Sequence, residues 1–259
     1  MTGFKDHFSA RSRDYAEFRP VYPAELFRFL ASQCAQAKFC WDAATGNGQA
    51  AQSLVEHFSH VYASDASANQ VQHATPHLRI RYAVEPAEKT ALGDGSCDLV
   101  TVAQAIHWLR QEDFYAEVRR VLKPGGLIAV WGYGLHSVDD AVDKVVRKFY
   151  SEIVGPFWPA ERRIIEEKYE TLPFPFQKIE TPQYEITAEY SLGEMRGYLA
   201  SWSATQGYIK QHGKNPLETI ASELKQAWGD AEKRTLRWPI YLKLGKSGHG
   251  LAAVSAAEP

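Results

Sequence analysis

Short apolar runs alternate with amphipathic, helix-compatible segments through the first half of the chain. These runs predict strands at 38–43, 60–65, 80–84, 97–103 and 127–131. The run 97–103, CDLVTVA, is apolar almost throughout, which is typical of a strand buried on both faces. Strand and helix alternate five times within about ninety residues, and this alternation predicts a parallel sheet with helices on both faces.

The pattern changes from Ser137 onward, where helical periodicity and aromatic residues dominate. We expect helices over 137–154, 161–170, 193–211 and 216–228, with β-like residues over 174–190. The last apolar run, 234–244, alternates in polarity but contains Pro239, which has no amide hydrogen to donate. This proline predicts a weakly paired strand or an edge strand. Near the N-terminus, 8–19 and 24–36 are also expected to be helical.

Composition and charge narrow the classes of function. The chain carries 29 Lys and Arg against 31 Asp and Glu, so its formal net charge is −2, and no basic block stands out. Nucleic acid is therefore not an expected partner, because phosphate binding normally requires clustered cations. The 3 Cys have neither metal-ligand nor disulfide spacing, and the N-terminus lacks an apolar signal segment. We expect a soluble cytoplasmic protein with no metal and no membrane partner, as a monomer or a homodimer.

The stretch Phe39–Gln49, FCWDAATGNGQ, joins the first predicted strand to the helix that follows it. The strand ends on Asp42, and the following small residues form a turn in which glycine, having no Cβ, lets the backbone approach a cofactor closely. A dinucleotide site is one interpretation, because Gly46-Asn47-Gly48 is followed three residues later by Ala51. However, a carboxylate placed before the glycines would face a pyrophosphate unfavourably.

The acids of this region suit a cofactor that is cationic and contains no phosphate. S-adenosylmethionine carries an ammonium, a sulfonium and a ribose. Asp42 can accept a hydrogen bond from the ammonium. Asp65 ends the second predicted strand, where a carboxylate can bind both ribose hydroxyls. The positions of the two acids therefore favour S-adenosylmethionine over a nicotinamide dinucleotide.

The turn also resembles a motif of a known family. Asp42-Ala43-Ala44-Thr45-Gly46-Asn47-Gly48 is similar to the D-x-G-x-G-x-G signature of class I S-adenosylmethionine-dependent methyltransferases, with Ala44 in place of the first glycine. The loop Pro86-Ala87-Glu88, whose proline stands where an acid is common, and the run Asp94–Val100 resemble the adenine-contacting loop and fourth strand. Val118–Gly126 resembles the helix and L-K-P-G-G passage before the fifth strand. Four motifs in register make the resemblance specific.

The resemblance implies a three-layer α/β/α sandwich around a Rossmann-like sheet of seven mostly parallel strands. The implied strand order is 3-2-1-4-5-7-6, with the last strand antiparallel, and a helical cap completes the fold. We expect one domain over 1–246, with the cap formed by 1–23 and an insertion near 150–230. Residues 247–259 are small and polar and are expected to form a disordered tail.

The same resemblance implies which residues bind the cofactor. Tyr15 and Arg19 could close over its amino-acid end, with Arg19 pairing with the carboxylate, or could instead lie on a surface helix. The full set of expected cofactor-binding residues is Tyr15, Arg19, Asp42, Ala44, Gly46, Gly48, Asp65, Ala66, Ala87, Glu88, Gln104 and Ala105.

A narrower resemblance, to the trans-aconitate methyltransferase-like group of small-molecule enzymes, covers most of the chain. The residues that carry it are Phe8, Tyr15, Arg19-Pro20, Tyr22-Pro23, 104–108 (QAIHW), Trp158-Pro159, Arg162 and 198–208 (YLASWSATQGY). This group implies methylation of a carboxylate or a related compound.

Candidate acceptor residues follow the predicted fourth and fifth strands or lie in the expected cap. His107 is at the end of the sheet where open α/β folds bind ligands, and could orient a substrate, remove a proton or serve as a core histidine. Trp131 and Tyr133 could line the acceptor pocket or pack in the core. Trp158 and Arg162 are expected in a segment that covers the cofactor, and Arg162 or the arginine next to it could bind a substrate carboxylate with two hydrogen bonds.

These observations predict in-line transfer of a methyl group from S-adenosylmethionine to a small molecule, with a carboxylic acid as the first choice of acceptor. A carboxylate is ionised at neutral pH, so its methylation needs no general base, and the sequence offers no compelling one. The alternatives are another O, N or S nucleophile, a nicotinamide-dependent oxidoreductase, and a cofactor-binding protein without turnover.

Overall fold

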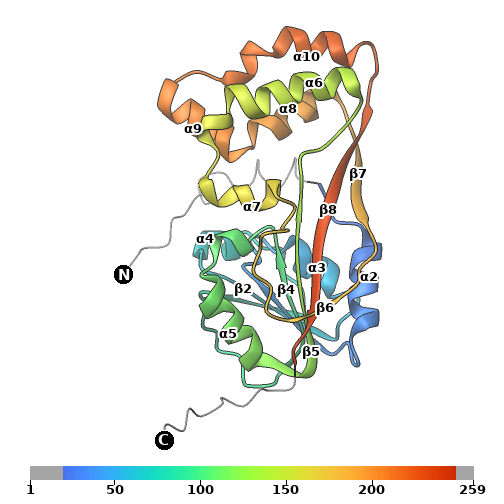
Figure 1. Cartoon of the computed structure of the whole chain (residues 1–259), viewed down its shortest axis with the longest axis vertical. Helices are drawn as coiled ribbons and strands as arrows, with labels where there is room; N and C mark the ends of the chain where they lie inside the picture. Colours follow the sequence, from blue (N-terminus) through green and yellow to red (C-terminus); the bar gives the residue numbers. More distant parts are fainter. Residues whose placement is uncertain (1–19, 249–259) are drawn as a thin grey trace, which may run out of the picture. The chain divides into compact units, whose positions relative to one another are not determined.

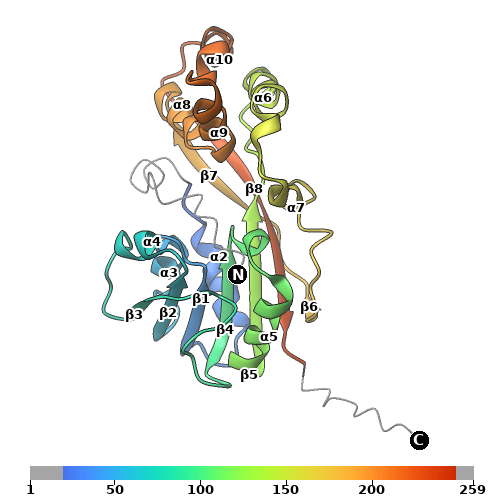
Figure 2. The same cartoon turned by 90° about the vertical axis from the view of Figure 1, so that its left-hand side faces the viewer.

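The five strands predicted from the first half of the chain pair in parallel in the computed structural model, which describes residues 20–248. They are β1 (Phe39–Ala43), β2 (His60–Asp65), β3 (Ile80–Val84), β4 (Cys97–Ala103) and β5 (Leu122–Tyr133). The accompanying helices are α2 (Ala24–Gln33), α3 (Gln49–Leu54), α4 (Ala68–Gln72), η2 (Ile106–Trp108) and α5 (Gln111–Val121). α5 covers one face of these strands, and α2 and α3 cover the other (Figures 1 and 2). The predicted alternation of strand and helix is confirmed.

Strands from the second half of the chain continue the sheet beyond β5. The order is β3-β2-β1-β4-β5-β8-β6, and β7 also pairs with β8. Both β6 (Gln177–Ile179) and β7 (Tyr184–Tyr190) are antiparallel to β8 (Arg234–Lys246). The predicted order 3-2-1-4-5-7-6 is confirmed, with β8 as its seventh strand. The sixth position is shared by β6 and β7, so the sheet has 8 strands rather than seven.

The prediction that Pro239 marks a weakly paired or edge strand is wrong. β8 is 13 residues long and lies between β5 on one side and β6 and β7 on the other. Pro239 stands opposite Glu185 of β7, and its carbonyl accepts a hydrogen bond of 3.0 Å from the Gly134 amide. A proline removes only its own amide donor from the ladder, so the rest of this long strand keeps its pairing.

The described chain divides into two compact units. Among residues 20–248, the first unit, called the sheet unit, comprises Ala24–Trp131, Leu172–Pro182 and residues 242–248. The second, called the helical unit, comprises residues 20–23, Gly132–Thr171 and Gln183–Tyr241.

The helical unit departs more from the predicted element boundaries. Its helices are α6 (Asp140–Lys148), η3 (Phe149–Ile153), η4 (Gly155–Phe157), η5 (Ala160–Arg162), α7 (Arg163–Glu166), α8 (Leu192–Ala200), α9 (Ser203–His212), η6 (Pro216–Thr219) and α10 (Ala221–Trp228). η3 is a π-helix that continues α6, a form often found at functional sites. The helix predicted over 161–170 ends early, because Lys168 and Tyr169 adopt φ values of 53° and 60° and the Tyr169 side chain is fully buried.

Trp41 of β1 is central to the core of the sheet unit. Its ring packs edge-on against Phe114 of α5, with the ring centroids 6.0 Å apart. Its indole Nε1 donates a hydrogen bond of 3.0 Å to Ser64 Oγ, so the one polar atom of this fully buried side chain is satisfied. Trp41 thus links β1, β2 and α5 through a single side chain.

Two cysteines are fully buried in neighbouring strands of the same core. Cys40 lies on β1 and Cys97 on β4, and neither is part of a disulfide. Burial raises the pKa of the Cys40 thiol well above its usual value and the pKa of Cys97 to about 11. Both side chains therefore behave as small apolar groups at neutral pH.

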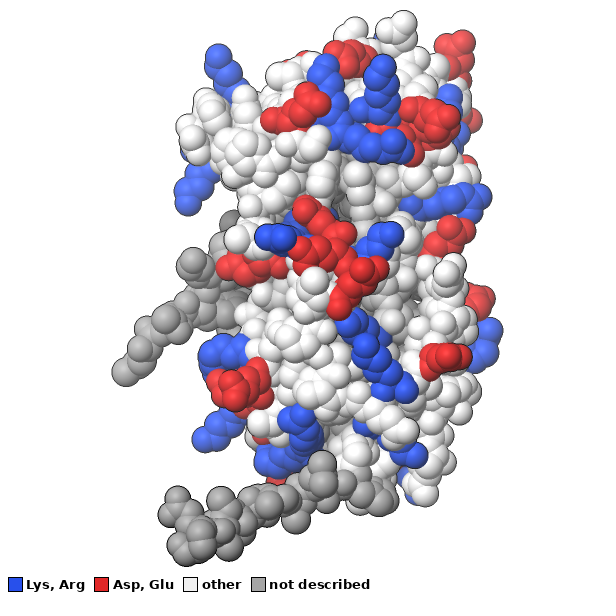
Figure 3. Space-filling view, in the orientation of Figure 1, with Lys and Arg blue, Asp and Glu red and all other residues white. Residues whose placement is uncertain are grey.

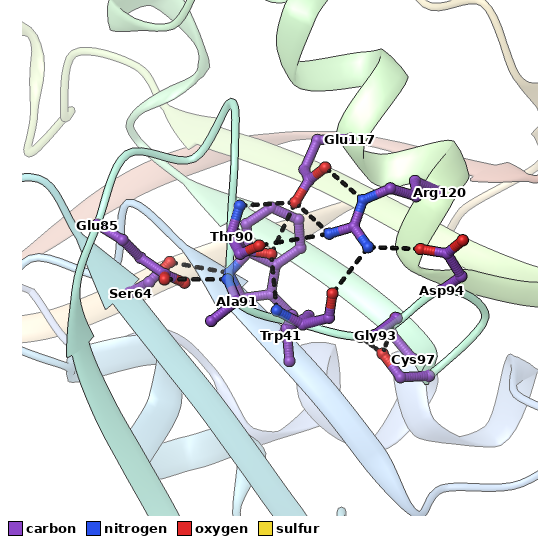
Figure 4. A network of polar contacts seen from close by, with 12 residues as sticks. Trp41, Ser64, Glu85, Thr90, Ala91, Gly93, Asp94, Cys97, Glu117 and Arg120 are labelled. Atoms are coloured by element: carbon purple, nitrogen blue, oxygen red, sulfur yellow. Dashed lines mark hydrogen bonds and ion pairs between the residues drawn. The ribbon is translucent and has the colours of Figure 1, made fainter.

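The loop between β3 and β4 has little regular structure, but a polar network fixes it to α5 (Figure 4). The Glu117 carboxylate accepts hydrogen bonds from the Thr90 amide and hydroxyl, each at 2.7 Å, and from the Arg120 guanidinium. Arg120 in turn donates to the Leu92 carbonyl and to Asp94. Burial alone would raise the pKa of Glu117, but these hydrogen bonds outweigh burial and lower it. The loop is therefore held in one conformation.

Charged side chains of both signs are interspersed on the face of the molecule shown in Figure 3. This distribution matches the near-neutral formal charge of −2. Within residues 20–248, none of the helices combines the length and the apolar character needed to cross a membrane.

Candidate functional site

The turn after β1 adopts a left-handed backbone at three positions. Ala44, Gly46 and Gly48 have φ values of 51°, 58° and 87°. A Cβ on Gly48 would also lie 2.4 Å from the Tyr82 hydroxyl oxygen, which donates a hydrogen bond of 3.0 Å to the Thr75 carbonyl. Glycine at 48 is therefore required both by the backbone conformation and by close packing against β3.

Asp65, at the end of β2, is held against this turn. Its Oδ2 accepts a hydrogen bond of 2.9 Å from the Gly46 amide, and its Oδ1 accepts one of 2.8 Å from the Ser67 amide. Each oxygen of a carboxylate can accept more than one hydrogen bond, so both oxygens keep capacity for the hydroxyls of a ligand. The neighbouring Ala66 is exposed beside the carboxylate.

Asp42 is the buried acid of the site, with 1% of its surface exposed. Its two oxygens accept hydrogen bonds from the hydroxyls of Thr101, at 2.7 Å, and Thr45, at 2.5 Å. Burial raises the pKa of Asp42 to about 6, although the two hydroxyls oppose this shift. A buried carboxylate with only neutral hydrogen-bond partners attracts a cationic group of a ligand.

The end of β4 shows the same backbone feature as the end of β1. Gln104 has a φ of 56°, and its amide donates a hydrogen bond of 2.8 Å to the Trp131 carbonyl on β5. The next residue, Ala105, is buried. Non-glycine residues with left-handed backbones, here Gln104 and Ala44, cluster at binding sites because the surrounding structure must compensate for their strain. Both lie at the carboxyl ends of adjacent parallel strands, where open α/β sheets bind ligands.

The loop after β3 contains Ala87 and Glu88, the two residues that are predicted to contact adenine, and their environments differ from each other. Ala87 is buried within the loop. The Glu88 carboxylate accepts a hydrogen bond of 3.0 Å from the Arg110 amide, immediately before α5, so it stabilises the start of that helix. The contact between these residues and adenine stays a prediction.

His107 lies on η2, directly after β4. Its ring centroid is 4.7 Å from that of Trp108, and its Nδ1 atom is buried. Trp131 is fully buried and packs edge-on against Phe27, with centroids 6.0 Å apart, which is a core environment. The roles of His107 in substrate orientation or proton removal remain predictions.

The remaining predicted residues belong to the helical unit. Tyr133 is buried, and its ring lies 6.2 Å from that of Tyr22. Arg162 and Trp158 are brought together, with the guanidinium carbon 4.3 Å from the Trp158 ring centroid. Tyr15 and Arg19 lie outside the described residues.

The geometry of the sheet unit fits S-adenosylmethionine. Gly46 and Gly48 leave the turn without side chains, and we expect Asp65 to offer carboxylate oxygens to the ribose and Asp42 to offer a negative charge to the ammonium. Ala44, Gln104 and Ala105 would border the same cofactor from the strand ends.

The parallel sheet, the turn and the two acids define a class of enzyme, and similarity to known proteins agrees with it. The chain belongs to the class I S-adenosylmethionine-dependent methyltransferases, and S-adenosylmethionine is its cofactor. The methyltransferase-domain family matches residues 41–130. This membership excludes the alternative of a nicotinamide-dependent oxidoreductase.

Individual relatives extend the similarity over nearly the whole chain. A Dictyostelium discoideum protein described as a methyltransferase is 33% identical over 253 residues, which cover 95% of this chain and 96% of that protein. A solved structure from Anaeromyxobacter dehalogenans, described as a type II methyltransferase, is 40% identical, with a TM-score of 0.85 and coverage of 90% and 99%. A malonyl-[acyl-carrier protein] O-methyltransferase of Marinomonas is 34% identical over 130 residues, 48% of this chain and 47% of that protein.

Several side chains that surround the turn after β1 or contact Arg162 were not identified from the sequence. Thr101 could have been noticed as the hydroxyl residue within the apolar run 97–103. Tyr82, which packs on Gly48, carries no local signal because the two residues meet only after β1 and β3 have joined the sheet. The same holds for Tyr150, which contacts Arg162 in the helical unit.

The affinity for S-adenosylmethionine is expected to depend on pH through Asp42. We expect the cofactor's ammonium to bind the ionised carboxylate of Asp42, whose pKa in the free protein is about 6. Binding should therefore be constant above neutral pH and weaken about tenfold per pH unit below 6, because a proton must first be removed. Isothermal titration calorimetry between pH 5 and 8 measures this dependence.

The Asp42→Asn variant is the control for the pH dependence. It should bind the cofactor weakly at every pH and lose the slope between pH 5 and 6. A flat affinity profile in the wild-type protein would refute the assignment of Asp42 to the ammonium.

The raised pKa of Asp42 also affects the stability of the free protein. Because the native state holds the Asp42 proton more tightly than the unfolded chain does, protonation of Asp42 stabilises the fold fully at low pH. This stabilisation is lost as the pH rises through about 6.

Proposed function

We propose that the enzyme transfers the methyl group of S-adenosylmethionine to a carboxylate oxygen of a small organic acid. The cofactor supplies an activated methyl group on its sulfonium, and the residues of the chain bind and orient the acceptor. The observation that carries this proposal is the environment of Arg162 in the helical unit.

Arg162 is held in a fixed orientation by two aromatic residues. Its guanidinium lies over the Trp158 ring at 4.3 Å, and its Nε donates a hydrogen bond of 3.2 Å to the Tyr150 hydroxyl. That hydroxyl donates in turn to Glu166 Oε1 at 2.7 Å. Burial raises the pKa of Tyr150 to about 12, although Arg162 opposes this shift, so the hydroxyl remains protonated. Little conformational entropy is then lost when the guanidinium binds a ligand.

The fixed Nε leaves the terminal nitrogens of Arg162 available as a pair. Among the described residues, neither of them has a hydrogen-bond acceptor. Two parallel N–H groups match the two oxygens of a carboxylate, and this bidentate arrangement is among the stronger polar contacts in proteins. Each carboxylate oxygen keeps a second lone pair with which it can attack a methyl group.

A hollow of about 420 Å³ within the helical unit is lined in part by Tyr150 and Trp158, the two residues that hold Arg162. Its walls are mainly aromatic and small residues, namely Tyr150, Ser151, Gly155, Trp158, Pro159, Ala160, Arg163 and Glu166. Tyr150 and Ser151 belong to the π-helix η3. This volume is in the range of small-molecule sites, and its walls suit the carbon skeleton of an organic acid.

The chemistry of a carboxylate also suits the buried histidine of this unit. His136 is buried, and burial lowers its pKa to about 3, so it is a poor proton acceptor. A carboxylate is already ionised at neutral pH and needs no proton acceptor, whereas an alcohol would. The Marinomonas relative is named for methylation of a malonyl group, which also carries a carboxylate.

Methyl transfer to a panel of organic acids tests the proposal. We expect at least one acid to yield a methyl ester and S-adenosylhomocysteine, while matched amines, thiols and phenols yield neither. Arg162→Ala should raise the KM for that acid about 10- to 100-fold, because a charge-assisted bidentate contact is lost, and leave the cofactor affinity unchanged. Mass spectrometry of the ester and steady-state kinetics measure both effects.

Two variants control for loss of positive charge. Arg162→Lys keeps the charge but not the planar fork, so its KM should lie between those of the wild type and Arg162→Ala. Arg196→Ala removes an exposed arginine of the same unit, which pairs with Glu218 at 3.2 Å, and should leave the KM unchanged. Transfer to an amine, thiol or phenol in preference to every acid would contradict the proposal.

A further inference from the structure

His136 is a polar side chain buried inside the helical unit. Only 4% of its surface is exposed. Among the described residues, neither Nδ1 nor Nε2 has a hydrogen-bond partner. Buried polar atoms in folded proteins are nearly always hydrogen-bonded, and each unsatisfied atom opposes folding. An imidazole with two such atoms therefore requires an explanation beyond packing.

The rings around His136 do not supply the missing hydrogen bonds. Its centroid lies 5.4 Å from that of Tyr198, 6.3 Å from Trp202 and 5.6 Å from Trp238. The hydroxyl of Tyr198 accepts a hydrogen bond of 2.9 Å from the Trp238 indole, so these two polar groups bond to each other. A phenylalanine would fill the same space at no polar cost.

The backbone on either side of His136 is fixed along β8. The Gly134 amide donates to the Pro239 carbonyl at 3.0 Å, and Ser137 and Arg237 exchange two hydrogen bonds of 2.9 Å each. These bonds hold His136 within the aromatic cluster. The position of the imidazole is thus determined by the strand pairing.

Trp202 connects this cluster to the proposed anion site. Its ring is 5.5 Å from that of Trp158 and 5.6 Å from that of Tyr150, the two residues that hold Arg162, and it also contacts His136. The imidazole and the guanidinium therefore belong to one continuous aromatic region of the helical unit. The neutral His136 imidazole, which can donate and accept a hydrogen bond, lies at one end of this region, and the cationic Arg162 guanidinium lies at the other.

We infer that His136 binds a non-ionised oxygen of the methyl acceptor, a hydroxyl or a carbonyl, so that the acceptor is a hydroxy or oxo acid. This inference rests on the proposed function. A neutral imidazole offers one N–H donor and one lone pair, which a hydroxyl can satisfy from either side. A second carboxylate at this position would be buried among aromatic rings without a compensating charge, which is strongly unfavourable.

Pairs of acids that differ by a single hydroxyl test the inference. Malate with succinate, and 3-phenyllactate with 3-phenylpropionate, are offered with S-adenosylmethionine to the full-length protein. The wild type should methylate the hydroxy member with at least about tenfold higher kcat/KM, because the deoxy member leaves the imidazole unpaired. In His136→Phe this preference should fall to within about twofold, with the affinity for S-adenosylmethionine unchanged.

Two further variants separate recognition from structure. His136→Gln keeps a donor and an acceptor and should restore part of the preference. His212→Phe replaces an exposed histidine that stacks on Tyr208 at 4.2 Å and should behave as the wild type. Because His136→Phe removes unsatisfied buried atoms, its urea midpoint should rise above that of the wild type.

The outcomes distinguish this inference from the proposed function. Methylation of both members of each pair at equal rates, or a hydroxyl preference that survives in His136→Phe, would overturn the role of His136 while leaving the acid acceptor intact. A lower urea midpoint in His136→Phe with unchanged kinetics would make His136 a structural residue. Absence of transfer to any acid would overturn both statements.

Discussion

Replacing Asp65 with alanine is expected to weaken S-adenosylmethionine binding by about 100- to 1,000-fold. The substitution would remove the carboxylate that is expected to bind the ribose. It would also remove the hydrogen bonds that Asp65 accepts from the Gly46 and Ser67 amides, at 2.9 and 2.8 Å, which hold the turn and the start of α4 in place. Isothermal titration calorimetry with S-adenosylmethionine and S-adenosylhomocysteine should show the same loss, because the ribose is common to both.

Asp98 provides a matched acid for this experiment. It is also buried, but it accepts hydrogen bonds from the Phe39 amide at 2.9 Å and from Lys123 Nζ at 2.7 Å. Asp98→Ala should therefore lower the free energy of unfolding by about 1–3 kcal/mol while changing the cofactor affinity of the folded protein less than about twofold. Equal losses of affinity in the two variants would refute the assignment of Asp65 to the ribose.

Gly48→Ala is expected to have the largest effect on stability, about 2–4 kcal/mol lost from the free energy of unfolding. The added methyl would meet the Tyr82 hydroxyl at 2.4 Å and its ring at 3.0 Å, on a backbone whose φ is 87°. Relief would require displacement of the Tyr82 side chain, whose hydroxyl would lose its hydrogen bonds with Thr75 and Gln52, or movement of the turn, so cofactor binding should fall as well. Urea denaturation followed by tryptophan fluorescence measures the change.

Comparison with Gly46→Ala separates two contributions to the stability lost in Gly48→Ala, namely backbone strain and steric crowding by Tyr82. Gly46 has a φ of 58°, but the nearest atom to its added methyl would be Gln70 Oε1 at 3.9 Å. Its cost should therefore be about 1 kcal/mol, the strain of a left-handed alanine alone. In a double-mutant cycle, Tyr82→Ala should recover the excess cost of Gly48→Ala. A similar cost at positions 46 and 48 would show that crowding by Tyr82 is unimportant.

The parallel part of the sheet could be predicted because its signals are local. Each strand from β1 to β5 is an apolar run bounded by a turn or a polar residue, so a few consecutive residues are enough to locate it. The two acids of the candidate cofactor site could be identified from the sequence for the same reason, since Asp42 and Asp65 end such runs. Ala44 shows that the first left-handed position of the turn does not require glycine, because an alanine adopts a φ of 51° there.

Features that depend on distant contacts could not be predicted in the same way. The helix expected over 161–170 stops short because Tyr169 is drawn into the core of the helical unit. β8 is internal because β6 and β7 return to pair with it, which the presence of Pro239 alone does not reveal. Arg162 could be named from its residue type, but its fixation by Trp158 and Tyr150 exists only in the folded chain.

The rate at which a thiol reagent labels the two buried cysteines can be used to measure local unfolding. Alkylating reagents attack the thiolate, and both the burial of Cys40 and Cys97 and their raised pKa values keep them protonated and out of reach. Since the two residues lie on the adjacent strands β1 and β4, a maleimide can reach them only when this part of the sheet opens. Their labelling rate therefore reports the opening of β4 and of β1, the strand that leads into the turn at 44–48.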